Sequence, residues 1–373
     1  MAGEVHCVFY DDDNPPRVSV HPYLANLEEQ TRRGLAVRGI CAQLKRNGFI
    51  PDAIVCHPGW GEGLFLKDVY PESPLLSYCE YYYAAKNSDL DFDPEFPPHP
   101  EAAPLIRLQN ACLLVSLTGS DAGFTPTHWQ KSLFPQEFMK KIKVIHEGVD
   151  TNRITPDPSA SFRIPGTDLT LDADCEVVTF ATRSLEPYRG FHTFMRALPF
   201  LLEARPRCHV LIVGKDEVAY GRRLPGGQSY REKYCSEIAF DPARVHFAPF
   251  LPFERYLSVL RISTVHAYLT YPFVLSWSLL EAMAAGCLVV GSDTAPVREI
   301  IRNGHNGLLV DFFNPYGLAH TIASCLEQRQ WLQGIRDEAR KTIVTKYDLE
   351  RKAIPAQLHL LSKTMDDFSR GAR

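Results

Sequence analysis

Hydrophobic positions in the second half of the chain follow two alternating patterns. Short apolar runs rich in β-branched residues predict strands, and longer stretches with apolar residues at three- and four-residue spacing predict helices. The predicted strands are Val177–Thr182, Val210–Val213, Val245–Phe247, Val265–Tyr268, Leu288–Ser292 and Leu308–Val310. The predicted helices are Phe191–Glu203, Tyr230–Ile238, Phe253–Leu260, Ser276–Met283 and Pro296–Arg302. This alternation is typical of a parallel sheet covered by helices on both faces.

The first half shows the same alternation less regularly. Its predicted strands are Val5–Tyr10, Ala53–Cys56, Leu75–Cys79, Ala111–Leu117 and Lys143–Ile145, and one long helix is predicted over Leu24–Asn47. A polar, proline-rich insertion occupies Lys86–Pro104. A second proline-rich stretch, Asn152–Asp174, has no helical period, and we interpret it as a hinge-linker.

Together the two halves predict an α/β fold with two doubly wound, Rossmann-like parallel-sheet domains that face each other across a cleft. The expected domains are residues 1–155 and 156–345, followed by a C-terminal helix, 346–373, that packs back on the first domain. Ligands of such sheets bind beyond the carboxyl ends of the strands. We therefore expect functional residues on the loops that follow strands.

Composition and charge narrow the classes of function. The chain has 373 residues, 45% hydrophobic and 23% charged, and its net charge of −4 gives no overall field to attract nucleic acid or an anionic membrane. Its ten cysteines include no C-x-x-C pair, which favours buried thiols in a reducing compartment over disulfides or a zinc site. No signal-like start or membrane-spanning stretch is present in the sequence. We expect a cytoplasmic protein with at most peripheral membrane contact.

Two arginines follow the strand Val177–Thr182. Arg183 and Arg189 lie on a loop that leads directly into the next helix. Two permanent cations beside a helix N-terminus suit a diphosphate, because their guanidinium groups donate planar pairs of hydrogen bonds. The alternative is a pair of solvated arginines.

The stretch from Tyr271 to Gly286 carries the densest chemical signal. Ser276 can cap a helix whose first amides would hold an anion. Glu281 lies in the same helix among apolar residues, where an unpaired carboxylate is costly. Its partner is either a pair of vicinal hydroxyls on a ligand or a neighbouring arginine or backbone amide.

Two loops of the first half are candidates for a sugar-facing site. One follows Cys56 with His57, Gly59, Trp60 and Gly61, and the other contains Glu80 and Tyr81. Glycines allow close approach of backbone to a ligand, and aromatic rings beside a carboxylate suit a sugar ring. Glu80 and His57 are the candidate catalytic residues here, for orienting a substrate or stabilising positive charge, and either could instead be a hydrogen-bonded core residue.

Other short motifs carry less weight. Asp91-Phe92-Asp93 has the spacing of a metal-binding Asp-x-Asp pair, but it lies in the proline-rich insertion and not at the end of an apolar strand, so we expect no metal site. Asp11-Asp12-Asp13 and Asp172-Ala173-Asp174 are interpreted as solvated turns. The absence of G-x-G-x-x-G and Walker motifs argues against a dehydrogenase or a P-loop enzyme.

As a set, the motifs resemble the retaining, nucleotide-sugar-dependent glycosyltransferases of family 4, which have the two-domain GT-B fold. The similar stretches are Arg183–Thr193, Ser276–Gly286, Gly291–Ile301, Asn303–Val310, Ser120–Gln130 and Val144–Thr151. The resemblance extends from about Gly3 to Leu361. Relatives usually begin with an earlier strand and a glycine-rich loop, so the first domain is expected to lack both.

The resemblance implies a donor site in the second domain. Arg183 and Arg189 would bind the donor diphosphate, with Arg189 standing where the family usually has lysine. Glu281 would hold the ribose hydroxyls, and Gly214 and Lys215 would border the base.

The same resemblance gives Leu275 and Ser276 a role through their backbone amides, which would face the phosphate or the transferred sugar. One position departs from the family's Glu-x7-Glu motif. Eight residues before Glu281 the chain has Phe273, so the first glutamate, which usually contacts the donor sugar, is absent.

We therefore expect a metal-independent glycosyltransferase that transfers a sugar from a nucleotide-diphosphate donor with retention of configuration. It would need no cofactor besides its donor substrate, and its acceptor would be a saccharide, a lipid-linked molecule or a protein. Two alternatives are a non-catalytic nucleotide- or sugar-binding protein that supports a partner enzyme, for which Phe273 is the evidence, and a sugar-nucleotide epimerase on the same plan.

Overall fold

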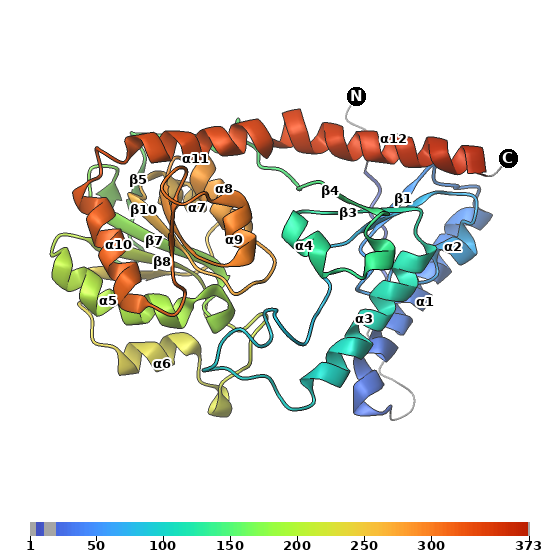
Figure 1. The fold of residues 1–373 in the computed structure, drawn as a ribbon, viewed down its shortest axis with the longest axis horizontal. Coiled ribbons are helices and arrows are strands. Elements are labelled where there is room, and N and C mark those ends of the chain that lie inside the picture. The colour runs from blue at the N-terminus through green and yellow to red at the C-terminus, as the bar shows by residue number, and fades with distance from the viewer. Residues whose placement is uncertain (1–4, 11–19, 372–373) are drawn as a thin grey trace. The chain divides into compact units, whose positions relative to one another are not determined.

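The computed structural model describes residues 5–10 and 20–371 and divides the chain into two compact units, each built on its own parallel sheet (Figure 1). Unit 1 comprises residues 1–91, 97–146 and 355–373, and unit 2 comprises residues 92–96 and 147–354. Two short pieces therefore belong to a different unit from their neighbours in the sequence. These are 92–96, which belongs to unit 2, and the C-terminal 355–373, which belongs to unit 1.

Unit 1 contains four parallel strands in the order β1-β2-β3-β4. They are β1 (Ile54–Cys56), β2 (Leu75–Tyr78), β3 (Ala122–Thr125) and β4 (Ile142–Val144). The helices are η1 (Pro22–Leu24), α1 (Ala25–Arg46), α2 (Leu66–Val69), α3 (Ala102–Gly119), α4 (His128–Leu133), η2 (Gln136–Phe138) and α12 (Ile354–Gly371). Side chains alternate across the sheet: Leu76 packs with Leu360 of α12, whereas Cys79 packs with Leu113 of α3. Helices α12 and α3 thus cover opposite faces.

Unit 2 contains six parallel strands in the order β12-β11-β10-β7-β8-β9. They are β7 (Val177–Ser184), β8 (His209–Lys215), β9 (Val245–Ala248), β10 (Val265–Tyr268), β11 (Leu288–Ser292) and β12 (Leu308–Val310). The helices are η3 (Pro187–Arg189), α5 (Phe191–Ala204), η4 (Pro225–Gly227), α6 (Tyr230–Glu237), α7 (Phe253–Arg261), α8 (Trp277–Ala284), α9 (Ala295–Ile300), α10 (Pro315–Glu327), α11 (Gln333–Lys346) and η5 (Leu349–Ala353). A two-stranded antiparallel hairpin, β5 (Ser161–Arg163) and β6 (Thr170–Asp172), completes the unit.

The alternation of side chains along β7 shows how the second sheet is covered. Phe180 stacks on Phe194 of α5, with ring centroids 4.7 Å apart, and α5 packs beside α10 (Figure 1). Ala181 faces the other way, into a core shared with the β5–β6 hairpin and α7. Burial on both faces explains why these strands are near-continuous apolar runs.

The secondary structure predicted for the second half is confirmed. All six strands and all five helices are present, each within two residues of its predicted ends. The fold class is confirmed as two α/β parallel-sheet units.

The first half contains two wrong predictions. Ala111–Leu117 lies inside helix α3 and is not a strand, and Val5–Tyr10 has no regular secondary structure and is exposed. The strand β3 (Ala122–Thr125) was not predicted, because its sequence Ala-Gly-Phe-Thr lacks a clear apolar run. Gly3, where the resemblance begins, and the turn expected at Asp11-Asp12-Asp13 lie outside the described residues.

The interpretation of Asn152–Asp174 as a linker is also wrong. This stretch folds as part of unit 2, because Phe162, Ile164 and Leu171 of the β5–β6 hairpin are buried against the sheet and α7. Pro165 lies in the turn between β5 and β6, so it shapes a folded hairpin instead of marking a flexible connection.

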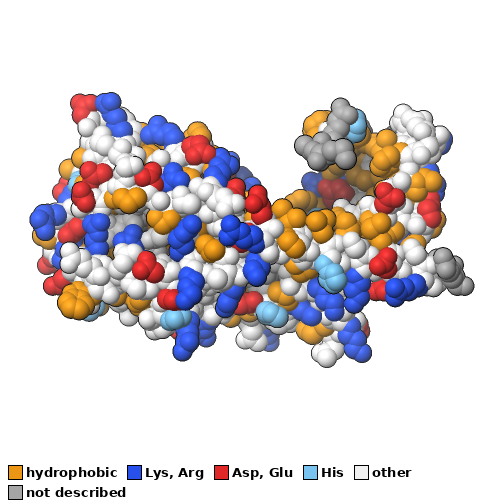
Figure 2. Space-filling view, turned by 90° about the horizontal axis from the view of Figure 1, so that it is seen from above, with side chains coloured by type: hydrophobic (Ala, Val, Ile, Leu, Met, Phe, Trp, Pro, Cys, Tyr) orange, Lys and Arg blue, Asp and Glu red, His pale blue; other side chains and the backbone are white. Residues whose placement is uncertain are grey.

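The surface in Figure 2 agrees with the balanced charge of the sequence. On the face seen from above, Lys and Arg side chains are interspersed with Asp and Glu over unit 2, with no large area of one sign. Within the described part of the chain, no helix is both long and apolar enough to cross a bilayer.

Gly190 is the tightest backbone position near the start of α5. Its φ is +69°, and a Cβ there would lie 2.3 Å from the Cβ of Leu269. We expect Gly190→Ala to lower the free energy of unfolding by about 2 kcal/mol or more, from the left-handed backbone and the clash. The measurement is urea denaturation followed by circular dichroism.

The matched control is Gly334→Ala in α11, where φ is not positive and no atom lies within 4 Å of the added Cβ. This change should leave stability unchanged or raise it by about 0.5–1 kcal/mol. Equal effects of the two substitutions would contradict the assignment of strain to Gly190.

Candidate active site

A cavity of about 470 Å³ opens at the carboxyl edge of the unit 2 sheet. Its walls come from the end of β7, the end of β8, the loop between β9 and α7, and the first turns of α8. Because all six strands are parallel, their carboxyl ends meet at one edge, which brings together segments up to 100 residues apart (Ala181 and Glu281). Arg183, Ser276 and Glu281, all predicted site residues, line this cavity.

Glu281 is held by a neighbour, as its apolar helix requires. The hydroxyl of Tyr256 on α7 donates a hydrogen bond to Oε2 of Glu281 at 2.9 Å. Burial raises the pKa of the Glu281 carboxyl, and the Tyr256 hydrogen bond offsets part of that rise. Oε2 is thus engaged, while the side chain still faces the cavity.

The N-terminus of α8 also faces the cavity. The side chain of Ser276 caps the helix by accepting a hydrogen bond from the backbone N–H of Ser278. The backbone N–H of Ser276 itself donates to the hydroxyl of Tyr268 at 2.8 Å, so in this conformation that amide is engaged within the protein. Leu275 is buried in the core beneath the helix and does not line the cavity.

A bulge near the end of β7 directs Arg183 toward the cavity. Ala181 pairs with Val213 and Ser184 with Lys215, so β7 has two intervening residues where β8 has only Gly214. The bulge brings the strands so close that a Cβ on Gly214 would lie 2.8 Å from the carbonyl oxygen of Thr182. Arg183 is exposed and lines the cavity, and glycine at 214 permits this geometry.

Two aromatic side chains at the cavity wall are strongly exposed. Phe250 is 63% exposed and Trp277 is 61% exposed, although both line the cavity. The ammonium group of Lys215, a predicted site residue, lies 5.5 Å from the centre of the Phe250 ring. Exposed rings beside a cation can stack on a planar ligand, and neither aromatic residue was predicted from the sequence.

Arg189 has a different place from Arg183. It is 6% exposed and does not line the cavity. Its Nη1 donates to Oγ1 of Thr270 at 3.1 Å and to the carbonyl oxygen of Val274 at 2.9 Å, which fixes the loop before α8. The ring of Phe273 lies 5.7 Å from the guanidinium, so the residue that replaces the family's glutamate helps to enclose Arg189.

The buried carboxylate of Glu186 was missed by the sequence analysis. It is fully buried and accepts hydrogen bonds from the hydroxyl of Ser184 and from the backbone N–H groups of Ala219, Tyr220 and Gly221, at 2.5 to 3.3 Å. These bonds fix the loop after β8. Glu186 lies in a loop with other polar residues, so the sequence does not distinguish this buried glutamate from a solvent-exposed one.

In unit 1, the structure brings together His57 and Glu80 at the carboxyl edges of β1 and β2. Nε2 of His57 lies 3.3 Å from Oε2 of Glu80, and Nδ1 accepts a hydrogen bond from the backbone N–H of Gly59 at 3.2 Å. Because Nδ1 accepts, Nε2 carries the proton and donates to the carboxylate. The carbonyl of Glu80 is held by the side chain of Gln130 at 2.5 Å.

The predicted residues around His57 fall into two groups. Trp60 is 55% exposed and stacks on the His57 ring, with centroids 4.1 Å apart, so it can face a ligand. Gly61 has φ of +113°, and a Cβ there would collide with the backbone of Gln30, so its glycine serves the turn. Tyr81 is buried and its hydroxyl donates to Asp89 at 2.7 Å, which indicates a structural role.

The Asp-Phe-Asp motif is split between the two units. Asp91 caps its own loop by accepting from the backbone N–H groups of Asn87 and Ser88, at 3.0 Å each. Asp93 belongs to unit 2, where it is 3% exposed and its Oδ2 contacts the hydroxyl of Tyr271 at 2.6 Å and Nε2 of His192 at 3.1 Å. Residues 5–10 and 20–371 contain no group of three His, Cys, Asp or Glu side chains placed to hold a metal ion.

The segment 92–96 therefore supports the loop that leads into α8, whose first turn lines the cavity. Phe92 packs against the ring of Tyr271, with centroids 5.1 Å apart, and Glu95 forms a bidentate ion pair with Arg196 at 2.6 and 2.7 Å. Tyr271 lies with Phe273 in the loop between β10 and α8. Although burial alone raises the pKa of Asp93, the hydrogen bonds from His192 and Tyr271 outweigh it and leave that pKa below its ordinary value.

We expect Asp93→Ala to destabilise unit 2 by about 3 kcal/mol at neutral pH, because it strands the buried His192 and Tyr271 donors. Since the pKa of Asp93 is lowered in the folded state, its stabilisation is present above about pH 4 and is lost as the pH falls through the folded-state pKa. Urea denaturation at several pH values should show the difference from the unmodified protein shrinking in acid.

Asp91→Ala is the matched control within the same motif. Its carboxylate is exposed and caps only local amides, so its effect on stability should stay within about 1 kcal/mol. Similar losses from both substitutions would contradict the special role of Asp93.

Comparison with known sequences agrees with the geometry. Residues 2–154 match the model of the glycosyl transferase family 4 group, and residues 170–342 match that of the glycosyl transferases group 1. The D-inositol 3-phosphate glycosyltransferase of Corynebacterium efficiens is 26% identical over 323 residues, covering 82% of this chain and 70% of the relative. The phosphatidyl-myo-inositol mannosyltransferase of Mycolicibacterium smegmatis is 29% identical over 178 residues, covering 46% and 41%.

Comparison with solved structures shows the same fold. HepE of Anabaena, determined in complex with UDP, aligns with a TM-score of 0.66 and 17% identity over 92% of this chain and 84% of that chain. Sucrose-phosphate synthase of Thermosynechococcus elongatus aligns with a TM-score of 0.66 and 17% identity over 94% and 82%. The fold is therefore GT-B, and the chain belongs to the group 1 glycosyltransferases of family 4.

Proposed function

We propose that unit 2 binds a nucleotide-diphosphate sugar and that the protein transfers the sugar to an acceptor with retention of anomeric configuration and without a metal ion. The observation that carries this proposal is the convergence of Arg183, the N-terminus of α8 and Glu281 on one cavity. A permanent cation and a helix N-terminus suit the diphosphate, and a carboxylate suits vicinal hydroxyls.

The cavity has the parts that a nucleotide needs. Its volume of about 470 Å³ lies within the usual range for small-molecule sites. The engaged Oε2 of Glu281 leaves Oε1 to accept from the ribose hydroxyls, and the exposed rings of Phe250 and Trp277 offer surfaces on which a base can stack. Three solved neighbours are complexes of Anabaena HepE with UDP, with UDP and glucose, and with UDP-glucose, which supports a sugar nucleotide as ligand.

The chemistry follows from the placement of charge. Departure of the diphosphate leaves an oxocarbenium-like sugar and builds negative charge on the leaving group. Arg183 and the first turn of α8 would stabilise that charge, while Arg189 positions the loop between Thr270 and Val274. In unit 1, the His57–Glu80 pair would orient the acceptor, with Trp60 as a ring for it to pack against.

The proposal that no metal is needed rests on the hydrogen bonds that the two carboxylates of the Asp-x-Asp motif form within the protein. Asp91 holds backbone amides, and Asp93 is bonded to His192 and Tyr271. Neither carboxylate is directed at the cavity lining. Turnover should therefore persist in excess EDTA, and its loss there, with recovery on adding Mg²⁺ or Mn²⁺, would contradict this part of the proposal.

The first test is calorimetric binding of UDP, GDP, ADP and dTDP. For whichever nucleotide binds, Arg183→Ala and Glu281→Gln should each weaken binding by about 10- to 100-fold, the value of one or two charge-assisted hydrogen bonds. The control is Arg207→Ala, whose side chain is 88% exposed and lies away from the cavity lining. Unchanged affinity in both site variants would overturn the site assignment.

The second test uses the pKa of Glu281. Because the ionised carboxylate accepts from the ribose, affinity should fall as the pH drops through the raised pKa of Glu281. Tyr256→Phe removes the hydrogen bond that lowers this pKa, so the loss of affinity should begin at a higher pH. Tyr316→Phe, at a 61% exposed tyrosine of α10, should leave the pH profile unchanged. An identical profile in Tyr256→Phe would contradict the role of Glu281.

A further inference from the structure

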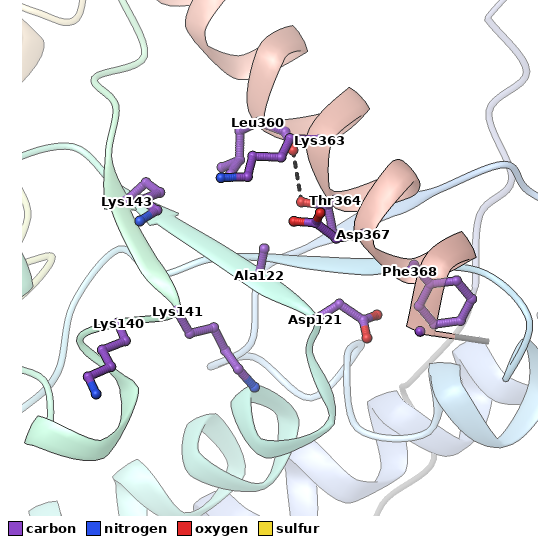
Figure 3. Close-up of a pocket in the computed structure, with 11 residues that line it drawn as sticks. Asp121, Ala122, Lys140, Lys141, Lys143, Leu360, Lys363, Thr364, Asp367 and Phe368 are labelled. Atoms are coloured by element: carbon purple, nitrogen blue, oxygen red, sulfur yellow. Dashed lines mark hydrogen bonds between the residues drawn. The ribbon is translucent and has the colours of Figure 1, made fainter. Parts of the chain in front are cut away.

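Unit 1 contains a second cavity, distinct from the loops of His57 and Glu80. It has a volume of about 670 Å³ and lies between the amino-terminal ends of β3 and β4 and one face of α12 (Figure 3). His57 and Glu80 follow the carboxyl ends of β1 and β2, which is the opposite edge of the same parallel sheet. The cavity therefore serves no residue of the proposed catalytic site.

Four lysines line this cavity, and one of them is committed to the fold. Lys141 donates to the carbonyl oxygens of Leu117 and Ser120 at the end of α3, at 3.0 and 2.5 Å. Asp121, also at the wall, accepts from the backbone N–H of Leu75 and forms an ion pair with Lys67, at 2.8 Å each. Its charge is thus neutralised from outside the cavity.

The other three lysines, Lys140, Lys143 and Lys363, form no salt bridge with any residue in the described part of the chain, and all three are exposed. Lys363 has an acidic residue one helical turn away, Asp367, at the spacing that normally allows an ion pair. In Figure 3, however, Lys363 extends away from Asp367, toward the side of the cavity where Lys143 projects from β4.

Two ammonium groups directed at one cavity repel each other unless an anion lies between them. An anion bound between the two ammonium groups would be attracted by both. The floor beside the lysines is apolar, formed by Ala122 and Leu360, and the ring of Phe368 closes one end.

We propose that this cavity is a binding site for a phosphate-bearing ligand, with the phosphate held between Lys143 and Lys363 and the remainder of the ligand lying along Leu360 toward Phe368. Lysine ammonium groups are common phosphate partners. The ligand is either a soluble phosphomonoester or the head of a phospholipid, and the test separates these sources.

The first experiment measures the reactivity of individual lysines on the full chain. Acetylation by a limiting amount of an N-hydroxysuccinimide ester is followed by mass spectrometry, with and without glycerol 3-phosphate at constant ionic strength. Lys143 and Lys363 should be modified severalfold more slowly in its presence, whereas Lys352, an exposed lysine of unit 2, should be unaffected. Equal protection of all three lysines, or of none, would overturn the proposal for soluble ligands.

The second experiment measures binding to variants. Lys143→Ala/Lys363→Ala should weaken binding of glycerol 3-phosphate, or of phosphatidylcholine vesicles containing phosphatidic acid, by about tenfold. The matched control is Lys352→Ala, and because the lysines replaced are exposed, circular dichroism should show unchanged folding. Weakening of glycerol 3-phosphate binding identifies a soluble ligand, and weakening of vesicle flotation alone identifies a lipid head.

The proposal fails if the double variant binds both probes as well as the unmodified protein. It is independent of the donor site, because Arg183→Ala should leave the protection of Lys143 and Lys363 unchanged. Loss of that protection in Arg183→Ala would mean that the phosphate binds in unit 2 instead.

Discussion

Two buried carboxylates, Glu186 and Asp93, hold loops at the carboxyl edge of the second sheet, and the loop held by Asp93 leads into α8, whose first turns line the cavity. Glu186 accepts hydrogen bonds from three backbone N–H groups of the loop after β8, and Asp93 accepts one from the hydroxyl of Tyr271 in the loop before α8. A buried charge is tolerated only when donors surround it. Each carboxylate therefore fixes its loop in one arrangement, since any other arrangement leaves the charge unsatisfied.

The surroundings of the buried Arg189 explain why a phenylalanine at position 273 is compatible with this edge of the sheet. Arg189 directs its Nη1 to Thr270 and to the carbonyl of Val274, and the ring of Phe273 encloses it. On the proposed function, Arg189 acts through the shape of the loop, whereas Arg183, on the β7 bulge, contacts the donor directly. Contacts to the transferred sugar must then come from groups other than a side-chain carboxylate at 273.

How far the sequence alone predicts this structure depends on how local each signal is. The strands of unit 2 are buried on both faces, so their continuous apolar runs were identified correctly, and the apolar helix around Glu281 correctly indicated that this carboxylate needs a partner. Ala111–Leu117 is also an apolar run, but a short run fits a buried helix as well as a strand, and here it lies in α3. The role of Asp93 could not be predicted, because its partners His192 and Tyr271 lie about 100 and 180 residues away.

The exchange of segments 92–96 and 355–373 means that the chain cannot be cut into two domains at one point. Division near residue 155 would remove Asp93 and Phe92 from unit 2, which leaves the Tyr271 hydroxyl and His192 without their buried acceptor. It would also remove α12 from unit 1 and expose the face of the sheet that carries Leu76. Loss of α12 exposes apolar side chains to water, and loss of Asp93 leaves buried polar groups without a hydrogen-bond partner. Both changes lower the free energy of unfolding. The stability of each unit therefore depends on chain from the other half of the sequence, and in unit 2 the loop that leads into α8 is held by residues of the segment 92–96.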